Sequence, residues 1–542
     1  MSFADGIFRN PLPVNDPVPS HAPGSPERAR LQAELARQSD VVLEIPCVVG
    51  GVRHFTGQVV EVRNPCDHNH LLARAHLATP ALVEQAIAAS QAAAGPWAGL
   101  PWEERAAVFL RAASLLAGPW RDRVNAATML GQAKTCHQAE IDAACELVDF
   151  WRFNVHFYRE LLSQQPPAEA AATWNRTELR PLEGFVFAVT PFNFTSIALN
   201  LPTAPALLGN VALWKPSNTQ LLSAWVGMEL LEAAGLPPGV INFLPGDGAD
   251  VGEPALASPH FAGLHFTGST ATFQHLYQRI AAQLPRYRSF PRIVGETGGK
   301  DFILAHTSAD VDALAVAALR GAFEFQGQKC SAASRMFVPR SLWPRLRDQL
   351  VGHMDALRMG DVRDFQTFIG AVIDERAWTK HRAFQALGGV GARTLRGGGG
   401  DRSTGWFIEP TLVEVEAPDH RLLAEEVFGP VLATFVYEDN AWDDVMRLID
   451  QGSPYALTGA VFANDRHAVH SALGGLRQAA GNFYINDKPT GAVVGQQPFG
   501  GARRSGTNDK AGAAANLMRW ASPRTIKENL CPPTDWRYPF LG

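Results

Sequence analysis

Short apolar runs that alternate with helical patterns fill the chain from residue 184 onward. The first two runs, at 184–191 and 210–216, end in proline and have the length of buried strands. The pattern then predicts, in order, a helix at 221–234, strands at 239–244 and 261–266, a helix at 269–283 and a strand at 292–294. Strands that alternate with helices indicate βαβ units, and therefore a parallel sheet.

The same alternation resumes after residue 301. It predicts strands at 301–305 and 334–338 and helices at 310–326 and 342–356. We therefore expect a second α/β domain that begins near Gly298. The length of 542 residues agrees with this, because such a chain exceeds one core and suggests roughly three domains.

Residues 80–164 are dominated by helical patterns. One helix is expected to begin at Pro80, with Thr79 as its N-cap. Another is expected over 140–151, where apolar residues recur at steps of three and four. Proline-rich segments at 1–28 and 521–542 discourage helix, so extended arms are expected at both ends.

Charge, hydropathy and cysteine usage argue against several classes of protein. The net charge of −5 gives no case for nucleic-acid binding, and no apolar run approaches the roughly 20 residues that span a bilayer. The six cysteines lack Cys-x-x-Cys or Cys/His spacing, so neither a disulfide framework nor a metal site is expected. The N-terminus lacks the features of signal and transit peptides. A cytoplasmic protein is expected, or a mitochondrial matrix protein if the source is eukaryotic.

Cys330 and Glu296 are candidates for a nucleophile and a base. The thiol stands among small and polar residues in Gly327-Gln328-Lys329-Cys330-Ser331, and the carboxylate stands upstream in Gly295-Glu296-Thr297-Gly298-Gly299-Lys300. Covalent catalysis on a carbonyl needs such a thiol and a carboxylate that activates water. The alternative is that Cys330 is a buried structural cysteine.

Several strand ends carry groups that suit a dinucleotide. Lys215 ends one run, and Gly268-Ser269 ends another and opens a helix, whose free N–H groups attract an anion. No G-x-G-x-x-G fingerprint follows a strand, so simple chain reversal is an alternative for each turn. Asn193, after the first run, can donate to an oxyanion or can serve the turn itself.

Two later segments can bind polar ligands. Glu426 and Phe428 lie two residues apart, and such a pair can bind ribose hydroxyls and support a nicotinamide ring. The glycine-rich loop from Gly491 to Gly501 can present backbone N–H groups to a carboxylate. The alternative for this loop is a flexible connector.

Seven motifs, taken in order, resemble the aldehyde dehydrogenase superfamily over about residues 45–527. They are Pro191-Phe192-Asn193, Lys215-Pro216-Ser217, Phe266-Thr267-Gly268-Ser269, Glu296-Thr297-Gly298-Gly299-Lys300, Gly327-Gln328-Lys329-Cys330, Glu426-Val427-Phe428-Gly429-Pro430 and Pro498-Phe499-Gly500-Gly501. The resemblance implies an α/β fold with a Rossmann-like cofactor domain, an α/β catalytic domain and a small β flap for oligomerisation.

The resemblance also implies the domain boundaries and the assembly. The NAD-binding domain with its N-terminal arm would comprise 1–164 and 183–297, the catalytic domain 298–520, and the flap 165–182 and 521–542. Exposed flap strands would add to a partner's sheet, so a homodimer or a higher assembly of dimers is expected.

Four further segments resemble one branch of the superfamily, which oxidises L-glutamate γ-semialdehyde. They are Gly24-Ser25-Pro26-Glu27-Arg28, Gln138-Ala139-Glu140-Ile141-Asp142-Ala143, Thr490–Arg503 and Ser505-Gly506-Thr507-Asn508-Asp509-Lys510. This branch implies NAD-dependent oxidation of the semialdehyde, formed from Δ1-pyrroline-5-carboxylate, to L-glutamate through a Cys330 thioester. That reaction is the second step of proline catabolism, which makes a proline dehydrogenase a candidate partner. The alternatives are an enzyme for another semialdehyde, such as succinate semialdehyde, and a non-catalytic protein on the same fold.

The resemblance assigns a role to each matching residue. Cys330 is the nucleophile, Asn193 holds the oxyanion and Glu296 activates water. Gly491 and Ala492 bind the substrate α-carboxylate through backbone N–H groups. The cofactor positions are Thr190, Lys215, Ser217, Gly268, Ser269, Glu426 and Phe428. The substrate positions are Glu146, Phe194, Lys329, Ser331, Gly491, Ala492 and Phe499.

One position departs from the pattern of the family. Many NAD-preferring relatives carry an acidic residue three positions after the strand-end lysine, where it meets the ribose 2′-hydroxyl. Here that position is Asn218. NAD is the expected cofactor, and NADP remains an alternative.

Overall fold

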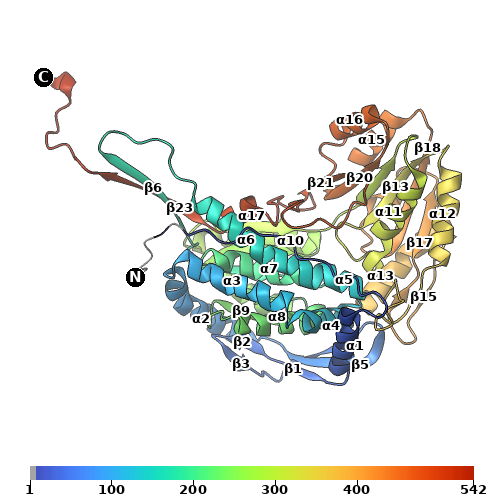
Figure 1. Cartoon of the computed structure of the whole chain (residues 1–542), viewed down its shortest axis with the longest axis horizontal. Helices are drawn as coiled ribbons and strands as arrows, with labels where there is room; N and C mark the ends of the chain where they lie inside the picture. The colour runs from blue at the N-terminus through green and yellow to red at the C-terminus, as the bar shows by residue number, and fades with distance from the viewer. Residues whose placement is uncertain (1–5, 7) are drawn as a thin grey trace.

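Two seven-stranded sheets form the frame of the molecule in the computed structural model, which describes residue 6 and residues 8–542 (Figure 1). The first sheet has the order β11-β10-β7-β8-β9-β2-β3. Its strands are β11 (Arg292–Glu296), β10 (Phe261–Thr267), β7 (Phe185–Val189), β8 (Val211–Lys215), β9 (Ile241–Phe243), β2 (Cys47–Val49) and β3 (Val52–His54). The five strands from β11 to β9 are parallel, whereas β2 and β3 are antiparallel additions at one edge. The predicted parallel sheet is therefore confirmed.

The second sheet has the order β14-β17-β18-β13-β12-β20-β21. Its strands are β14 (Ala392–Arg396), β17 (Thr411–Val415), β18 (Val431–Tyr437), β13 (Ala333–Pro339), β12 (Asp301–Ala305), β20 (Thr458–Phe462) and β21 (Asn482–Ile485). Only the β14–β17 pair is antiparallel. The second α/β unit expected after Gly298 is confirmed, and Figure 1 shows it as the yellow and orange lobe.

Helices cover the sheets and bury their central strands. Around the first sheet they are α2 (Pro80–Ala98), α3 (Trp102–Ala117), α4 (Arg121–Gln132), α6 (Leu147–Leu162), α7 (Thr195–Leu207), α8 (Leu221–Ala233), α9 (Gly248–Ala257) and α10 (Thr270–Gln283). Around the second they include α11 (Val311–Phe323), α12 (Trp343–Asp355), α15 (Trp442–Gln451) and α16 (Arg466–Gly475). Burial on both faces explains why β7 and β8 are continuous apolar runs without alternation. Thr79 caps α2 as predicted, because its side chain accepts a hydrogen bond from the Leu82 N–H.

Two helices differ from the sequence prediction. In the helix expected over 140–151, the first seven residues form a π-helix, Glu140–Glu146, which continues into α6. The wider π turn changes which side chains share a face, and such turns are frequent at functional sites. The helix expected over 310–326 ends at Phe323, because Phe325 and Gln326 adopt left-handed conformations with φ of 51° and 55°.

The flap predicted from residues 165–182 and 521–542 contains a two-stranded ribbon. β6 (Thr173–Arg180) pairs antiparallel with β23 (Ser522–Asn529) over their whole lengths. The ribbon projects from the body in Figure 1, and the C-terminus extends beyond it. The pairing agrees with the expected flap, and the domain boundaries remain a prediction.

Residues 1–5 and 7 of the arm predicted over 1–28 lie outside the described residues, and the described part of the arm is extended only before Pro26. Residues 8–22 contain no helix or strand, but α1 begins at Pro26 and runs to Ser39, with the Ser25 hydroxyl as its cap. A separate three-stranded sheet, which the sequence did not indicate, combines β1 (Leu43–Ile45), β5 (Asp67–His76) and β4 (Val59–Asn64). Within the described residues, no helix is long and apolar enough to cross a membrane.

Candidate active site

Cys330 lies on a strained loop between α11 and β13. Phe325 and Gln326 are consecutive non-glycine residues with left-handed φ angles, and Gly327 follows with φ of 64°. Such conformations cost about 1–2 kcal/mol each for ordinary residues and cluster at functional sites. The Gln326 side chain fixes the turn, because its Nε2 donates to the Ala371 carbonyl oxygen at 2.7 Å and its Oε1 accepts from the Gly370 N–H at 3.1 Å. The loop therefore holds the thiol in one place.

The Cys330 thiol is half-buried and lies among carboxylates. Burial raises its pKa, and the nearby charges of Asp301, Glu296 and Glu426 raise it further. The raised pKa favours the neutral thiol, and removal of its proton makes the sulfur a better nucleophile. The segment that follows Glu296 reaches this position, since a Cβ on Gly299 would come within 2.4 Å of the Cys330 carbonyl oxygen.

Asn193 connects the end of β7 to the Cys330 loop. Its buried Nδ2 donates to the Gln328 carbonyl oxygen at 3.0 Å, two residues before the thiol. An asparagine amide carries a second N–H donor. The contact brings the predicted oxyanion donor to the loop of the predicted nucleophile.

Glu296 is the last residue of β11, and its side chain is half-buried. Its Oε2 accepts a hydrogen bond from the Gly501 N–H at 3.2 Å. Burial raises the pKa of this carboxyl well above its usual value, against the effects of that hydrogen bond and of the Lys510 ammonium. A carboxylate with a raised pKa is matched to proton transfer near neutral pH.

The predicted cofactor positions meet at one edge of the first sheet. β10, β7 and β8 are neighbours, and their carboxyl ends carry Ser269, Thr190 and Lys215. Burial lowers the pKa of Lys215 to about 8. Thr190 accepts a hydrogen bond from the Trp214 Nε1–H at 3.1 Å, and the Ser217 hydroxyl lies 3.1 Å from that of Thr219. Ligands of doubly wound sheets bind at such an edge.

The turn after β10 joins the start of α10 to the end of β11. Ser269 is the N-cap of α10, and its hydroxyl accepts from the Thr272 N–H at 3.1 Å. Gly268 donates its N–H to the Glu296 carbonyl oxygen at 3.2 Å, and a Cβ on Gly268 would lie 2.8 Å from the Phe266 ring. The start of α10 thus stands beside the strand that carries the predicted base.

The carboxylate of Asp247 lies beside Asn218, the position where many NAD-preferring relatives carry an acidic residue. The Asn218 Nδ2 donates to the Asp247 Oδ1 at 3.3 Å, and the charge of Asp247 acts on the Lys215 ammonium. Asp247 follows β9, the next strand of the sheet, so its position beside Lys215 depends on strand order. In the sequence, Asp247 lies in the glycine-containing turn Pro245-Gly246-Asp247-Gly248. The spacing of these glycines differs from the G-x-G-x-x-G fingerprint, so the sequence did not indicate a site there.

Glu426 and Phe428 approach the first sheet from the second lobe. The Glu426 Oε1 accepts a hydrogen bond from the Gly299 N–H at 2.9 Å. A Cβ at position 298 would lie 2.2 Å from the same oxygen, so a residue larger than glycine there would displace the Glu426 carboxylate. Phe428 has a φ of 56°, and its ring meets that of Phe192 edge to face at 5.9 Å between centroids. Both residues therefore lie at the junction that holds Glu296 and Cys330.

Glu146 belongs to a buried acidic cluster at the π-helix. The Ser196 Oγ lies 2.7 Å from both the Asp142 Oδ1 and the Glu146 Oε2. The single hydroxyl of Ser196 thus lies between two carboxyl groups. Burial and the Asp142 charge raise the pKa of Glu146 to about 8, which favours its protonated form more than in an exposed glutamate.

Lys134 is a site residue that the sequence did not indicate. It is fully buried and pairs with Asp142, and its Nζ lies 4.1 Å from the centroid of the Phe194 ring. The same ammonium lies 4.4 Å from the Phe325 ring. Lys134 therefore fixes the predicted substrate ring of Phe194 against the Cys330 loop through cation–π contacts.

The glycine loop of residues 491–501 reaches the residue after the nucleophile. The Ser331 and Thr490 hydroxyl oxygens lie 2.7 Å apart, and Gly491 follows with φ of 92°. Ala492 is half-buried. The Phe499 backbone pairs with Ala511 in both directions, at 3.0 and 2.8 Å between N and O.

Lys329 is engaged in an ion pair within the protein. Its Nζ lies 3.2 Å from the Glu324 Oε2, and Lys488 approaches the same oxygen at 3.5 Å. Burial lowers the pKa of Lys329 to about 8. If Lys329 contacts a substrate carboxylate, it does so while it is also paired with Glu324.

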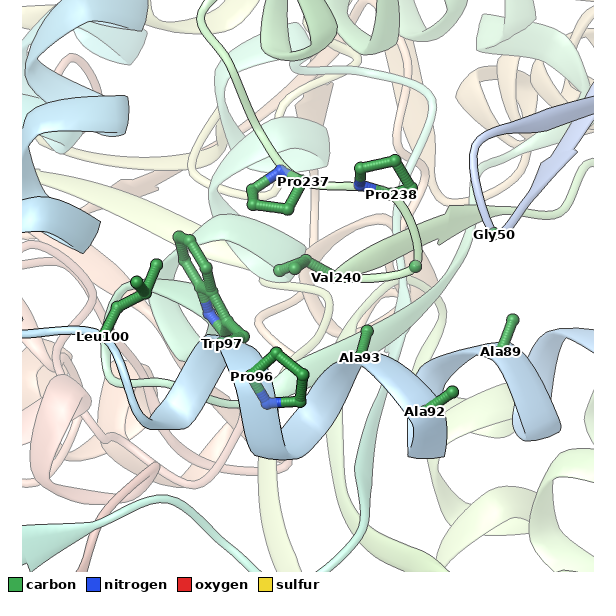
Figure 2. Close-up of a pocket in the computed structure, with 11 residues that line it drawn as sticks. Gly50, Ala89, Ala92, Ala93, Pro96, Trp97, Leu100, Pro237, Pro238 and Val240 are labelled. Carbon is green, nitrogen blue, oxygen red and sulfur yellow. The ribbon is translucent and has the colours of Figure 1, made fainter.

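A separate pocket of about 560 Å³ lies between α2 and the turn at 237–240 (Figure 2). Apolar side chains such as Trp97, Leu100 and Pro237 line it, without any titratable group. None of the predicted site residues lines this pocket. It therefore offers neither a nucleophile nor a base.

Sequence and structure comparisons place this arrangement in a known family. Residues 53–526 match the sequence model described as "Aldehyde dehydrogenase family". The chain belongs to the aldehyde dehydrogenase family. The resemblance inferred from the seven motifs and the α/β aldehyde dehydrogenase fold are thereby confirmed.

Individual members of the family resemble this chain over almost its whole length. The mitochondrial delta-1-pyrroline-5-carboxylate dehydrogenases of Dictyostelium discoideum and Homo sapiens are 50% and 47% identical, over 98% and 97% of this chain and 96% and 94% of their own lengths. The crystal structure of the Delta-pyrroline-5-carboxylate dehydrogenase from Mycobacterium tuberculosis bound with NAD superposes with a TM-score of 0.96 at 54% identity. That match covers 99% of this chain and 100% of the other.

Proposed function

We propose that this aldehyde dehydrogenase oxidises L-glutamate γ-semialdehyde, formed from Δ1-pyrroline-5-carboxylate, to L-glutamate with NAD, in the second step of proline catabolism. The observation that carries the proposal is the hydrogen bond between Ser331 and Thr490. It brings a loop suited to a carboxylate against the residue that follows the nucleophile. The similar proteins of Dictyostelium discoideum and Homo sapiens, named for the pyrroline substrate, support this choice.

In the first half of the reaction, Cys330 attacks the aldehyde. The thiol would give its proton to a water molecule, a C–S bond would form from the sulfur electron pair, and the carbonyl π electrons would move to oxygen. The Asn193 amide and the Cys330 backbone N–H would stabilise this oxyanion, because fixed donors need no reorganisation as charge develops. When bound, NAD supplies the acceptor for the hydride that leaves the substrate carbon. Cys330 is then joined to the substrate as a thioester.

In the second half, Glu296 releases the product. Its carboxylate would take a proton from water, whose oxygen adds to the thioester carbonyl while the C–S bond breaks. The electron pair returns to the Cys330 sulfur, and the new carboxylic acid ionises. The contact between Glu296 and Gly501 supports this role, because it fixes one carboxylate oxygen and leaves the other for water.

The residues at the sheet edge fit a dinucleotide. Lys215 and the N-terminus of α10 supply a cation and free N–H groups for hydroxyl and phosphate oxygens. Thr190, Ser217 and Gly268 complete this edge of the proposed site. Across the junction, Glu426 would bind ribose hydroxyls and Phe428 would support the nicotinamide ring.

The substrate end would be held by the glycine loop and two rings. The backbone N–H groups of Gly491 and Ala492 would bind the α-carboxylate, with Ser331 and Lys329 beside them. Phe194 and Phe499 would enclose the aliphatic middle. Glu146 would lie near the substrate amine, whose positive charge would favour ionisation of this carboxyl.

The proposed chain organisation consists of two domains and a flap. The cofactor domain would comprise 1–164 and 183–297, the catalytic domain 298–520, and the flap 165–182 and 521–542. Pairing of the flap with a second copy would give a homodimer. A cytoplasmic location is proposed, or the mitochondrial matrix if the source is eukaryotic, and a separate proline dehydrogenase remains a candidate partner.

A comparison of substrates tests the proposal. NADH formation would be measured with Δ1-pyrroline-5-carboxylate, succinate semialdehyde and propionaldehyde at equal enzyme concentration. We expect kcat/KM for the first to exceed the others by about 10²-fold or more, because a site that binds a polar group discriminates strongly against analogues that lack it. A preference for succinate semialdehyde would support the alternative substrate. The absence of NADH with every aldehyde would contradict catalysis.

A further inference from the structure

The N-terminal arm contacts the proposed substrate loop through one side chain. The Asn15 Nδ2 donates to the Val494 carbonyl oxygen at 2.8 Å, and the Asn15 Oδ1 accepts from the Gln496 Nε2 at 2.9 Å. Both partners lie in the segment between Gly491 and Phe499. A residue near the start of the chain is therefore built into a loop near its end.

The same side chain also binds the helix that continues from Glu146. The Asn15 Nδ2 donates to the Asp149 Oδ2 at 2.8 Å, and the neighbouring Asp16 N–H donates to the Asp149 Oδ1 at 2.8 Å. Both N–H donors and the oxygen of the Asn15 amide are thus used. Asp149 lies three residues after Glu146, so the two project from the same side of the helix.

Ion pairs hold this part of the arm in place. The buried Asp16 pairs with Arg121 at 2.7 Å and with Arg152 at 2.9 Å, between carboxylate oxygen and guanidinium nitrogen. Farther along, the His21 ring lies 2.7 Å from the buried Glu140 carboxylate. Asn15 therefore stands on an anchored segment.

The loop packs closely on α6 where Asn15 joins them. Gly495 has a φ of 84°, and a Cβ there would come within 2.2 Å of the Phe153 ring. Val494 is buried, and Gln496 and Gln497 donate their backbone N–H groups to the Val493 carbonyl oxygen at 3.0 and 2.9 Å. The turn is thus compact, and Asn15 is the side chain that ties it to Asp149.

We propose that Asn15 is a positioning residue for substrate. It sets the separation between Gly491–Ala492, which would bind the α-carboxylate, and Glu146, which would lie near the amine. The inference rests on the proposed function. An aldehyde that lacks the amino acid end does not use either group, so its oxidation is independent of Asn15.

The test is the isosteric variant Asn15→Asp in the full-length enzyme. It removes both donors and places a carboxylate beside Asp149 and the Val494 carbonyl. We expect KM for Δ1-pyrroline-5-carboxylate to rise about tenfold or more, because both hydrogen bonds that Asn15 donates are lost, with kcat and the kcat/KM for propionaldehyde unchanged. The control is Asn10→Ala, since that side chain donates only to the adjacent Pro11 carbonyl oxygen.

A double variant distinguishes positioning from general stability. Asn15→Asp with Asp149→Asn exchanges amide and carboxylate, so a hydrogen bond between these positions can form again. We expect the KM of the double variant to recover in part. Inhibition by L-glutamate should be weaker in Asn15→Asp than in the unmodified enzyme and should recover in part in the double variant. Equal losses with both aldehydes, or an unchanged KM in a folded Asn15→Asp enzyme, would overturn the proposal.

Two further results keep the test decisive. If Asn15→Asp does not fold, Gln496→Ala removes the contact from the exposed side of the loop. An unchanged KM in that variant would overturn the proposal. If the unmodified enzyme does not oxidise Δ1-pyrroline-5-carboxylate, the proposed function fails instead, and the two failures are distinguishable.

Discussion

The Glu296 carboxylate accepts a hydrogen bond from the Gly501 N–H at 3.2 Å, across 205 residues of sequence. Glu296 ends a strand of the first sheet, and Gly501 ends the glycine loop that leads from Thr490. Thr490 in turn meets Ser331, next to Cys330. The proposed base, the proposed substrate loop and the proposed nucleophile are therefore linked by two hydrogen bonds.

Replacement of the thiol tests the nucleophile. We expect Cys330→Ala to lower steady-state NADH formation by about 10³-fold or more, because no thioester can form. Binding of NAD, measured by calorimetry, should be unchanged, since the thiol is not among the proposed cofactor contacts. Wild-type turnover in this variant would contradict the assignment.

Glu296→Gln should separate the two halves of the reaction. The thioester still forms, so a burst of about one NADH per active site is expected, followed by turnover that is slower by about 10²–10⁴-fold. Stopped-flow absorbance measures both phases. A steady-state rate equal to that of the unmodified enzyme would show that another group activates water.

The raised pKa of Glu296 also predicts a pH dependence. A base acts when it is deprotonated, and burial raises the pKa of this carboxyl well above its usual value. The fraction of active carboxylate therefore grows as pH rises through a range above that of an exposed glutamate. The raised pKa of the Cys330 thiol acts in the same direction, since more thiolate forms as pH rises. We expect kcat to increase with pH, and the hydrolysis of a preformed thioester to lose this dependence in Glu296→Gln.

Gly491→Ala tests the carboxylate loop. A φ of 92° is unfavourable for alanine, and the new Cβ would lie 3.3 Å from the Lys488 Nζ. We expect KM for Δ1-pyrroline-5-carboxylate to rise about tenfold, with propionaldehyde oxidation unchanged. Gly474→Ala in α16 is the matched control, because a Cβ there meets no atom within 4 Å. Equal behaviour of the two variants would contradict the role of the loop.

Asp247 is expected to disfavour a 2′-phosphate at the adenosine ribose. Its carboxylate lies 3.3 Å from the Asn218 Nδ2 and acts on Lys215. Asp247→Ala should therefore improve kcat/KM for NADP about tenfold relative to NAD, since a like charge is removed. Asp250→Ala, at an exposed position on α9, is the control. If the ratio of kcat/KM for NADP to kcat/KM for NAD is unchanged in Asp247→Ala, the ribose 2′-hydroxyl does not lie beside Asp247.

The flap should control assembly. Removal of residues 522–542 deletes β23 and leaves β6 without its antiparallel partner. We expect this variant to be monomeric in light scattering, whereas removal of 531–542 alone should leave the ribbon and the dimer intact. A monomeric full-length protein would contradict the proposed role of the flap.

The sequence predicted most of the elements that position the candidate site. The runs that became β7, β8 and β10 were recognisable because strands buried on both faces are continuously apolar. The π-helix at Glu140–Glu146 could not be predicted, since its apolar spacing matches an ordinary helix over so short a segment. The early end of α11 at Phe323 was also missed, because left-handed Phe325 and Gln326 depend on tertiary contacts such as those of the Gln326 amide.

By itself the sequence determined the alternation of strands and helices over residues 184–356, the seven motifs and, through them, the family, and it proposed Cys330, Glu296 and Asn193 as catalytic residues. These follow from local periodicity and from short motifs, which need no knowledge of distant contacts. Only the tertiary structure placed Asp247 beside Asn218, Lys134 beside Phe194, and Asn15 between Asp149 and Val494. Such contacts join residues far apart in the chain. They depend on strand order and packing, which local patterns in the sequence do not specify.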